Sequence, residues 1–180
     1  MKDGQIINAL MLEIENQLTI YGILPADLHV TRSNQPSSQY SGAISSTKKY
    51  QVFLTPVVST QIGSGSDRQG DKINYQHVKA KSYQISCLVD FDYADVEAIP
   101  AHDLAQIIND MLQQRDAARN LRTKGVQVQE CSNVRPTFSV NNSDNYESEP
   151  SFDITIIYQS SYTKEIETIE ETVNPLIGIV

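Results

Sequence analysis

Few residues in this chain have the types and spacing that chemistry requires. Residues 63–70, GSGSDRQG, contain a Gly-x-Gly, a pattern found in loops that cradle phosphate groups. No helical pattern follows this segment, and no Gly-Lys-Ser or Gly-Lys-Thr accompanies it, so a helix N-terminus that would complete a phosphate site is not expected. We interpret the segment as a turn at the tip of a hairpin.

Metal chemistry is not predicted either. The three histidines are scattered along the chain: His29, His77 and His102. They lack the His-x-x-x-His or Cys-x-x-Cys spacing typical of zinc sites. Asp90, Asp92 and Asp95 offer oxygen ligands, but the glycine and the bidentate glutamate of a calcium-binding loop are missing, which favours a solvated helix entry. We expect neither a metal nor another cofactor.

Nucleophilic and acid–base catalysis have equally little support. Cys87 falls in phase with the apolar residues around it and is expected in the core, and with Cys131 it makes no disulfide framework. No serine lies in a Gly-x-Ser-x-Gly elbow. The carboxylate pairs Glu147/Glu149 and Glu170/Glu171 lie in stretches that look too polar to raise a carboxyl pKa by burial. We expect a non-enzyme, although a small-ligand-binding domain or a hydrolase with a spatially assembled site stays an alternative.

Length and charge restrict the class of protein further. The 180 residues predict a single domain spanning 1–180. With 14 basic against 22 acidic residues and a net charge of −8, stable wrapping on nucleic acid is disfavoured, whereas an acidic passage would let DNA slide without sticking. No apolar run approaches the roughly 20 residues that a membrane span needs, so we expect a soluble protein made in the cytoplasm.

Two helices are predicted from apolar periodicity. Residues 3–18 place apolar side chains at helical spacing, with Asp3 able to cap the first turn. A second helix starts at Pro100 and carries its apolar stripe through 104–112. A short helical piece continues through 117–121 and ends at Gly125.

The remaining patterns are typical of strands. Residues 28–32 and 50–58 are the first two, and Pro56 argues for an edge or a bulge near the end of the second. Residues 73–91 alternate, with an exposed part from Tyr75 to Lys81 and a buried part from Tyr83, as in a hairpin whose outer half projects beyond the core.

A long ribbon follows towards the C-terminal end. Residues 126–129 and 152–158 alternate as half-buried strands around a polar middle, and 163–180 are interpreted as an extended C-terminal arm. The order helix, strands, helix, strands predicts an α+β fold: a mainly antiparallel sheet with two helices on one face, long β-hairpin loops and the C-terminal arm.

Several segments in this order resemble the tail-terminator, or neck-terminator, family of tailed phages. They include the opening helix, the SNQP at 33–36, the LTPV at 54–57, and the helix 103–112 followed by Ala117-Ala118-Arg119. The ribbon from NVRP at 133–136 to PSFD at 150–153 is the strongest match. The resemblance covers most of the chain and is carried by the order of these segments.

The resemblance implies a structural virion protein with a fold like that of the lambda tail terminator. Such a protein forms a homohexameric ring on the head-proximal end of the tail tube, stops tube polymerisation and joins the tail to the head. Its implied partners are the tail tube protein, a head-completion or connector protein, the sheath in contractile tails, and genomic DNA passing through the lumen. No membrane partner is implied, and another tail-completion or tube protein is the nearest alternative.

Polar loops are the expected partner contacts. They span 33–47, 59–72 and 137–149, and their tips supply the candidate contact residues: Gln61, Ser64, Asp67, Arg68, Asn142, Asn145 and Tyr146. Exposed strand edges in such regions are open to completion by a neighbouring subunit.

Overall fold

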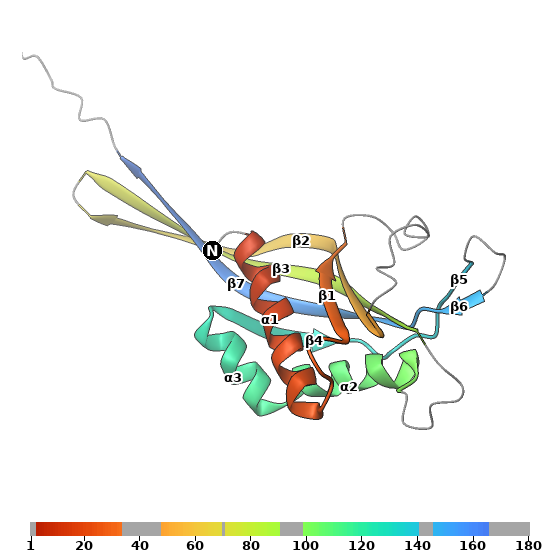
Figure 1. The fold of residues 1–180 in the computed structure, drawn as a ribbon. Coiled ribbons are helices and arrows are strands. Elements are labelled where there is room, and N and C mark those ends of the chain that lie inside the picture. Colours follow the sequence, from red (N-terminus) through yellow and green to blue (C-terminus); the bar gives the residue numbers. More distant parts are fainter. Residues whose placement is uncertain (1–2, 34–47, 70, 91–98, 141–145, 166–180) are drawn as a thin grey trace, which may run out of the picture.

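The computed structural model describes residues 3–33, 48–69, 71–90, 99–140 and 146–165. A five-stranded sheet carries the helices on one face (Figure 1). The helices are α1 (Asp3–Tyr21), α2 (Ala101–Gln113) and α3 (Arg115–Thr123). The strands are β1 (Leu28–Arg32), β2 (Tyr50–Gln69), β3 (Lys72–Val89), β4 (Val126–Cys131), β5 (Phe138–Val140), β6 (Tyr146–Ser148) and β7 (Ser151–Glu165).

The predicted α+β fold is confirmed. The sheet order is β1-β2-β3-β7-β4, and every pair in it is antiparallel except β1 with β2. The helices number three among the described residues, not two, because Gln114 adopts an extended conformation that separates α2 from α3. Gly125 follows α3 with φ of 76°, as expected of a glycine that ends a helix.

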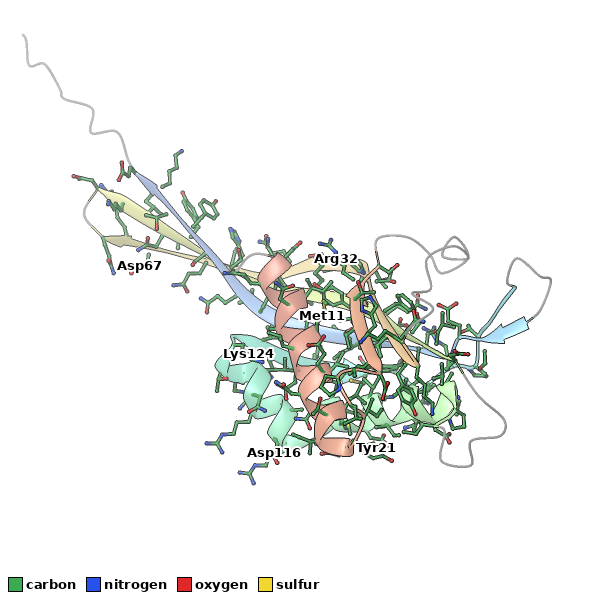
Figure 2. All side chains as sticks on the ribbon, viewed as in Figure 1. Met11, Tyr21, Arg32, Asp67, Asp116 and Lys124 are labelled. Carbon is green, nitrogen blue, oxygen red and sulfur yellow. The ribbon has the colours of Figure 1, made fainter. Side chains whose placement is uncertain are left out.

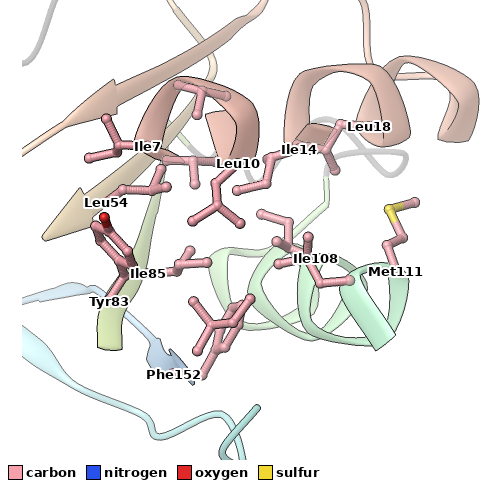
Figure 3. Close-up of a cluster of buried hydrophobic side chains, with 14 of the residues drawn as sticks. Ile7, Leu10, Ile14, Leu18, Leu54, Tyr83, Ile85, Ile108, Met111 and Phe152 are labelled. Atoms are coloured by element: carbon pink, nitrogen blue, oxygen red, sulfur yellow. The ribbon is translucent and has the colours of Figure 1, made fainter. Parts of the chain in front are cut away.

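The core lies between the sheet and the helices. The predicted stripe of α1 is buried, with Leu10, Ile14 and Leu18 at 1% exposure or less. These side chains meet sheet residues such as Ile85 and Phe152 and the α2 residue Ile108 in one cluster (Figure 3). Apolar burial of this kind is the main force that holds the two layers together.

The segment 63–70 is not the turn region expected from its glycines. β2 continues through it to Gln69 and pairs with β3 along its whole length. Gly63 and Gly65 are extended here rather than in a left-handed conformation, because the ladder to β3 supplies their backbone partners. Two register shifts interrupt the ladder, between Pro56 and Val58 and between Gln61 and Gly63. The bulge predicted near Pro56 is therefore confirmed.

The projecting hairpin expected from the 73–91 pattern is present, and a third strand joins it. Residues 57–69 of β2, 72–80 of β3 and 159–165 of β7 extend together away from the body of the molecule (Figure 1). We call this three-stranded projection the arm. β7 extends beyond the predicted strand at 152–158. The prediction ended too early because the outer half of β7 is polar and lacks the alternation that marks a half-buried strand.

Other expectations have mixed outcomes. Of the proposed C-terminal arm 163–180, residues 163–165 belong to β7 and the rest lie outside the described residues. Residues 34–47 of the first polar loop lie outside them too. Glu149 contradicts the expectation that its stretch is too polar for burial, since it is 6% exposed. The backbone N–H of Glu149 donates to the Thr137 carbonyl at the base of the β5–β6 hairpin.

Candidate assembly surfaces

The arm presents two strand edges that no other described strand covers. β1 pairs with β2 only as far as Leu54, so the edge of β2 is open from Thr55 to Gln69. β4 pairs with β7 only as far as Tyr158, so the other edge of the arm is open from Gln159 to Glu165. Open edges of this length are sites where another chain can add, and soluble proteins usually protect them.

The two bulges give the β2 edge a particular shape. Val57 and Ile62 are the residues that each bulge leaves without a partner in the β2–β3 register, and they are 60% and 54% exposed. Bulges interrupt edge-to-edge pairing and redirect side chains. The basal half of the arm therefore displays apolar side chains instead of a regular backbone edge.

Side-chain contacts across the strands give the arm a defined shape. The rings of Tyr75 and Tyr162 stack with their centroids 4.9 Å apart, and His77 stacks on Tyr162 at 5.6 Å. Thr163 donates to the side chain of Asn74 at 2.7 Å. Cross-strand pairs of this kind each stabilise a sheet by a fraction of a kcal/mol, on the order of 0.2–1 kcal/mol. The arm is thus an ordered projection.

A charged cluster joins the base of the arm to the start of α1. Lys81 donates to Asp3 at 2.7 Å, and the Tyr158 hydroxyl donates to the same carboxylate at 3.2 Å. Lys81 was expected to be exposed, but its side chain is 10% exposed because it lies under α1 and over the Tyr83 ring. Burial, with the Asp3 charge nearby, raises the pKa of Tyr83 to about 12 and also raises the pKa of Tyr158. The cluster thus ties the start of α1 to β3 and β7 where the arm begins.

The stabilising effect of this cluster is expected to depend on pH. The hydrogen bond from Lys81 lowers the pKa of Asp3 below its ordinary 3.8, against the opposing effect of burial. A lowered pKa in the folded state stabilises the fold above pH 3.8, and this contribution disappears as the pH falls through the lowered value. Asp3→Asn should therefore lower the melting temperature at about pH 7 and have little effect at about pH 2.

Thermal melting of the wild type and the variant at both pH values tests this expectation. Asp116→Asn is the matched control, since Asp116 also lies in the first turn of a helix but is not in the cluster around Lys81. An equal effect of Asp3→Asn at both pH values would contradict a role for its charge.

A second apolar surface lies at the C-terminal end of α1. Three large apolar side chains are exposed at the end of this helix and just after it: Ile20, Tyr21 and Leu24. We call this surface the heel. It borders a cavity of about 290 Å³ lined by Tyr21, Gly22, Ile23, Leu24, Asp27, Lys49, Tyr50 and Ile99. The labels of Tyr21 and Asp67 in Figure 2 show that the heel and the tip of the arm lie far apart on the molecule.

The predicted contact residues divide between these regions. Gln61, Ser64, Asp67 and Arg68 all lie on β2 in the arm, and all are exposed. Tyr146 begins β6, whose hairpin with β5 lies at the opposite end of the sheet from the arm (Figure 1). The remaining two, Asn142 and Asn145, lie outside the described residues. The structure thus brings four of the seven together, on one strand.

The sequence reasoning missed the apolar members of both surfaces. Val57 and Val58 are adjacent in a strand, so one of them had to face outwards. Ile20 lies outside the buried stripe of α1. These were available signals, since apolar residues out of phase with a core pattern indicate a second apolar surface.

The structure also places some of the residues considered for metal binding and nucleophilic chemistry. No group of three His, Cys, Asp or Glu side chains within them is placed to hold a metal ion. Cys87 is fully buried, as predicted, and burial raises the pKa of its thiol, while burial raises the pKa of Cys131 to about 11. Among the helices that the structure describes, none is long and apolar enough to span a membrane.

Comparison with known proteins gives one family. The family described as E217 gateway protein gp29 matches residues 5–168 of this chain. The match includes the described helices and strands almost completely, and with them the arm and the heel. No curated protein matches the chain.

Proposed function

The chain belongs to the family of the E217 gateway protein gp29, a phage head-to-tail joining family, and we propose that it works as the tail terminator in the neck of a tailed-phage virion. Six copies form a ring on the head-proximal end of the tail tube. The ring stops polymerisation of the tube and offers the surface on which the head docks. The role is structural and needs no catalysis.

The observation that carries this proposal is the arm. It projects from the body with two open edges, exposed apolar side chains and no buried core of its own, which is the arrangement of an element that contacts neighbouring chains. A contact between two different surfaces of one chain repeats from copy to copy and generates a closed ring when the rotation allows it. The body, by contrast, is a closed layered core.

The partners follow from the position of a terminator. The tail tube protein lies below the ring, a head-completion or connector protein lies above it, and the sheath contacts it if the tail contracts. DNA passes through the lumen without specific binding, in keeping with the net charge of −8. Assembly takes place in the host cytoplasm, before the protein becomes part of the virion.

Light scattering on a size-exclusion column over a range of concentrations tests the proposal, together with binding to purified tail tubes. We expect a ring of six chains of 20.1 kDa, which is six times 20.1 or 120.6 kDa, either in solution or at the tube ends. Electron microscopy of the bound tubes should show one ring at one end. Long stacks would instead indicate a tube protein, and a monomer that ignores tubes would contradict the proposal.

A further inference from the structure

The exposed large apolar side chains of the described residues fall into two separate groups. One belongs to the arm: Val57, Val58, Ile62, Val78 and Tyr162. The other is the heel, with Ile20, Tyr21 and Leu24, while Leu12 is exposed about two turns earlier on α1. We propose that the basal half of the arm of one copy docks, through Val57 and Ile62, on the heel of a second copy of this chain. The inference rests on the proposed ring and adds the two surfaces that build it.

The bulges explain why these two residues are the anchors. A residue of a regular strand faces one side of the sheet, whereas a bulge residue is redirected. Val57 and Ile62 both occupy bulges on the open edge of β2, and both are apolar although most of the surrounding residues from 59 to 69 are polar. A regular open edge would accept any strand, whereas two spaced apolar side chains require a partner with matching hollows.

The heel supplies such a hollow. Its cavity of about 290 Å³ is large enough to admit an aliphatic side chain and has Tyr21 and Leu24 in its lining. Ile20, next to it, is 79% exposed, the highest value among the large apolar side chains described. Anchors buried in a pocket and surrounded by a polar rim are typical of protein–protein interfaces.

Charge favours a second copy as the occupant. Residues 57–80 and 159–165 contain Arg68, Lys72, Lys79 and Lys164 against Asp67, Asp71 and Glu165, a net charge of +1. The whole chain carries −8, so the rest of it carries −8 − 1 = −9. The arm is thus the part of the chain that meets an acidic neighbour without repulsion.

The geometry makes the contact one between two different surfaces. The arm and the heel lie far apart on one molecule (Figure 2), so both are available at once for different neighbours. Each copy then uses its arm on one neighbour and its heel for another, which is the head-to-tail arrangement that closes into rings.

Complementary variants test this arrangement. The arm variant carries Val57→Asp and Ile62→Asp, and the heel variant carries Ile20→Asp and Leu24→Asp. All four side chains are exposed, so both variants should melt like the wild type. Each alone should lose self-association by on the order of a hundredfold or more. A mixture of the two retains one intact contact, so it should form heterodimers and no ring.

Cysteine cross-linking tests the same contact even where association in solution is weak. In a Cys131→Ser background, Ile62→Cys and Leu24→Cys are placed in separate chains, leaving the fully buried Cys87 as the native thiol. Disulfide-linked dimers should form in the mixture and not in either protein alone. One chain carrying both cysteines should give a ladder of linked species, whose highest rung counts the copies in the ring.

The outcomes separate this inference from the proposed function. A ladder that ends at a number other than six keeps the contact and contradicts the hexamer. Normal rings from the arm and heel variants, or the absence of mixed cross-links at any concentration, would overturn the contact, whatever the variants do to tail binding. Gln127→Asp, which adds one negative charge to an exposed position on β4, and Ile62→Val, which keeps the apolar anchor, should both assemble normally.

Discussion

A chain whose arm is shortened by its outer half is expected to fold and to form rings, but to yield no infectious particles. The variant replaces residues 64–77 with Asn-Gly, a two-residue turn that suits a hairpin. Gly63 and Val78 are partners in the β2–β3 register, so the Asn-Gly turn connects the two shortened strands without changing how they pair. We expect the tip, around Asp67 and Arg68, to dock on the partner ring and the loss of that contact to block head-to-tail joining.

The buried core should stay intact in this variant, because none of the residues removed belongs to it. Residues 160–165 of β7 lose their partners on β3, so the remaining cost in stability should be confined to the arm. The basal anchors Val57 and Ile62 are kept, so ring formation should survive as well. The measurements are thermal melting, light scattering and the infectious titre in a complementation assay. A second variant with Asp67→Asn and Arg68→Gln keeps the strands and tests the charges alone. A normal titre from the shortened arm would rule out the docking role of the tip.

Replacing Phe152 with alanine is expected to lower the free energy of unfolding by about 3–5 kcal/mol. Phe152 is 0% exposed, faces Ile85 across the β3–β7 ladder, and belongs to the cluster in Figure 3. The loss combines the transfer of the ring out of water with the cavity that its removal leaves. Urea unfolding followed by circular dichroism measures the change.

Two controls calibrate this result. Phe152→Leu keeps most of the buried volume and should cost about 1 kcal/mol. Tyr162→Ala removes an aromatic ring that is 54% exposed and stacked on Tyr75, so its cost should be about 0.5–1.5 kcal/mol. A loss from Phe152→Ala no larger than that from Tyr162→Ala would contradict the role of the buried Phe152 ring in stabilising the core.

Apolar periodicity predicted those parts of the fold that bury a face. The stripe of α1, the inner half of β3 and the first part of β7 were found because each alternates or repeats against the core. The arm escaped this reasoning in part, because the outer parts of β2 and β7 are mostly exposed and carry no alternation of buried and exposed residues. Glycines 63 and 65 suggested a turn, yet pairing with β3 decided the conformation.

The candidate surfaces were less predictable than the fold. Exposed polar residues near a hairpin tip, such as Asp67 and Arg68, could be recognised from the polar composition of their segment. The burial of Lys81 was not, because it depends on Asp3, which is 78 residues away in the chain. The heel likewise needs the end of α1 and the segment around Lys49 to meet in space. Contacts between distant segments leave no local pattern.

The sheet order also has a consequence for biosynthesis. β7 lies between β3 and β4, although the ribosome makes both of those strands before it. The nascent sheet therefore has a gap until β7 emerges, and the core lacks Phe152, Ile154, Ile156 and Tyr158 until then. The arm lacks its third strand for the same period. A chain released before β7 is made has neither a closed core nor a complete arm, and so it cannot take the place of a finished chain in the assembly.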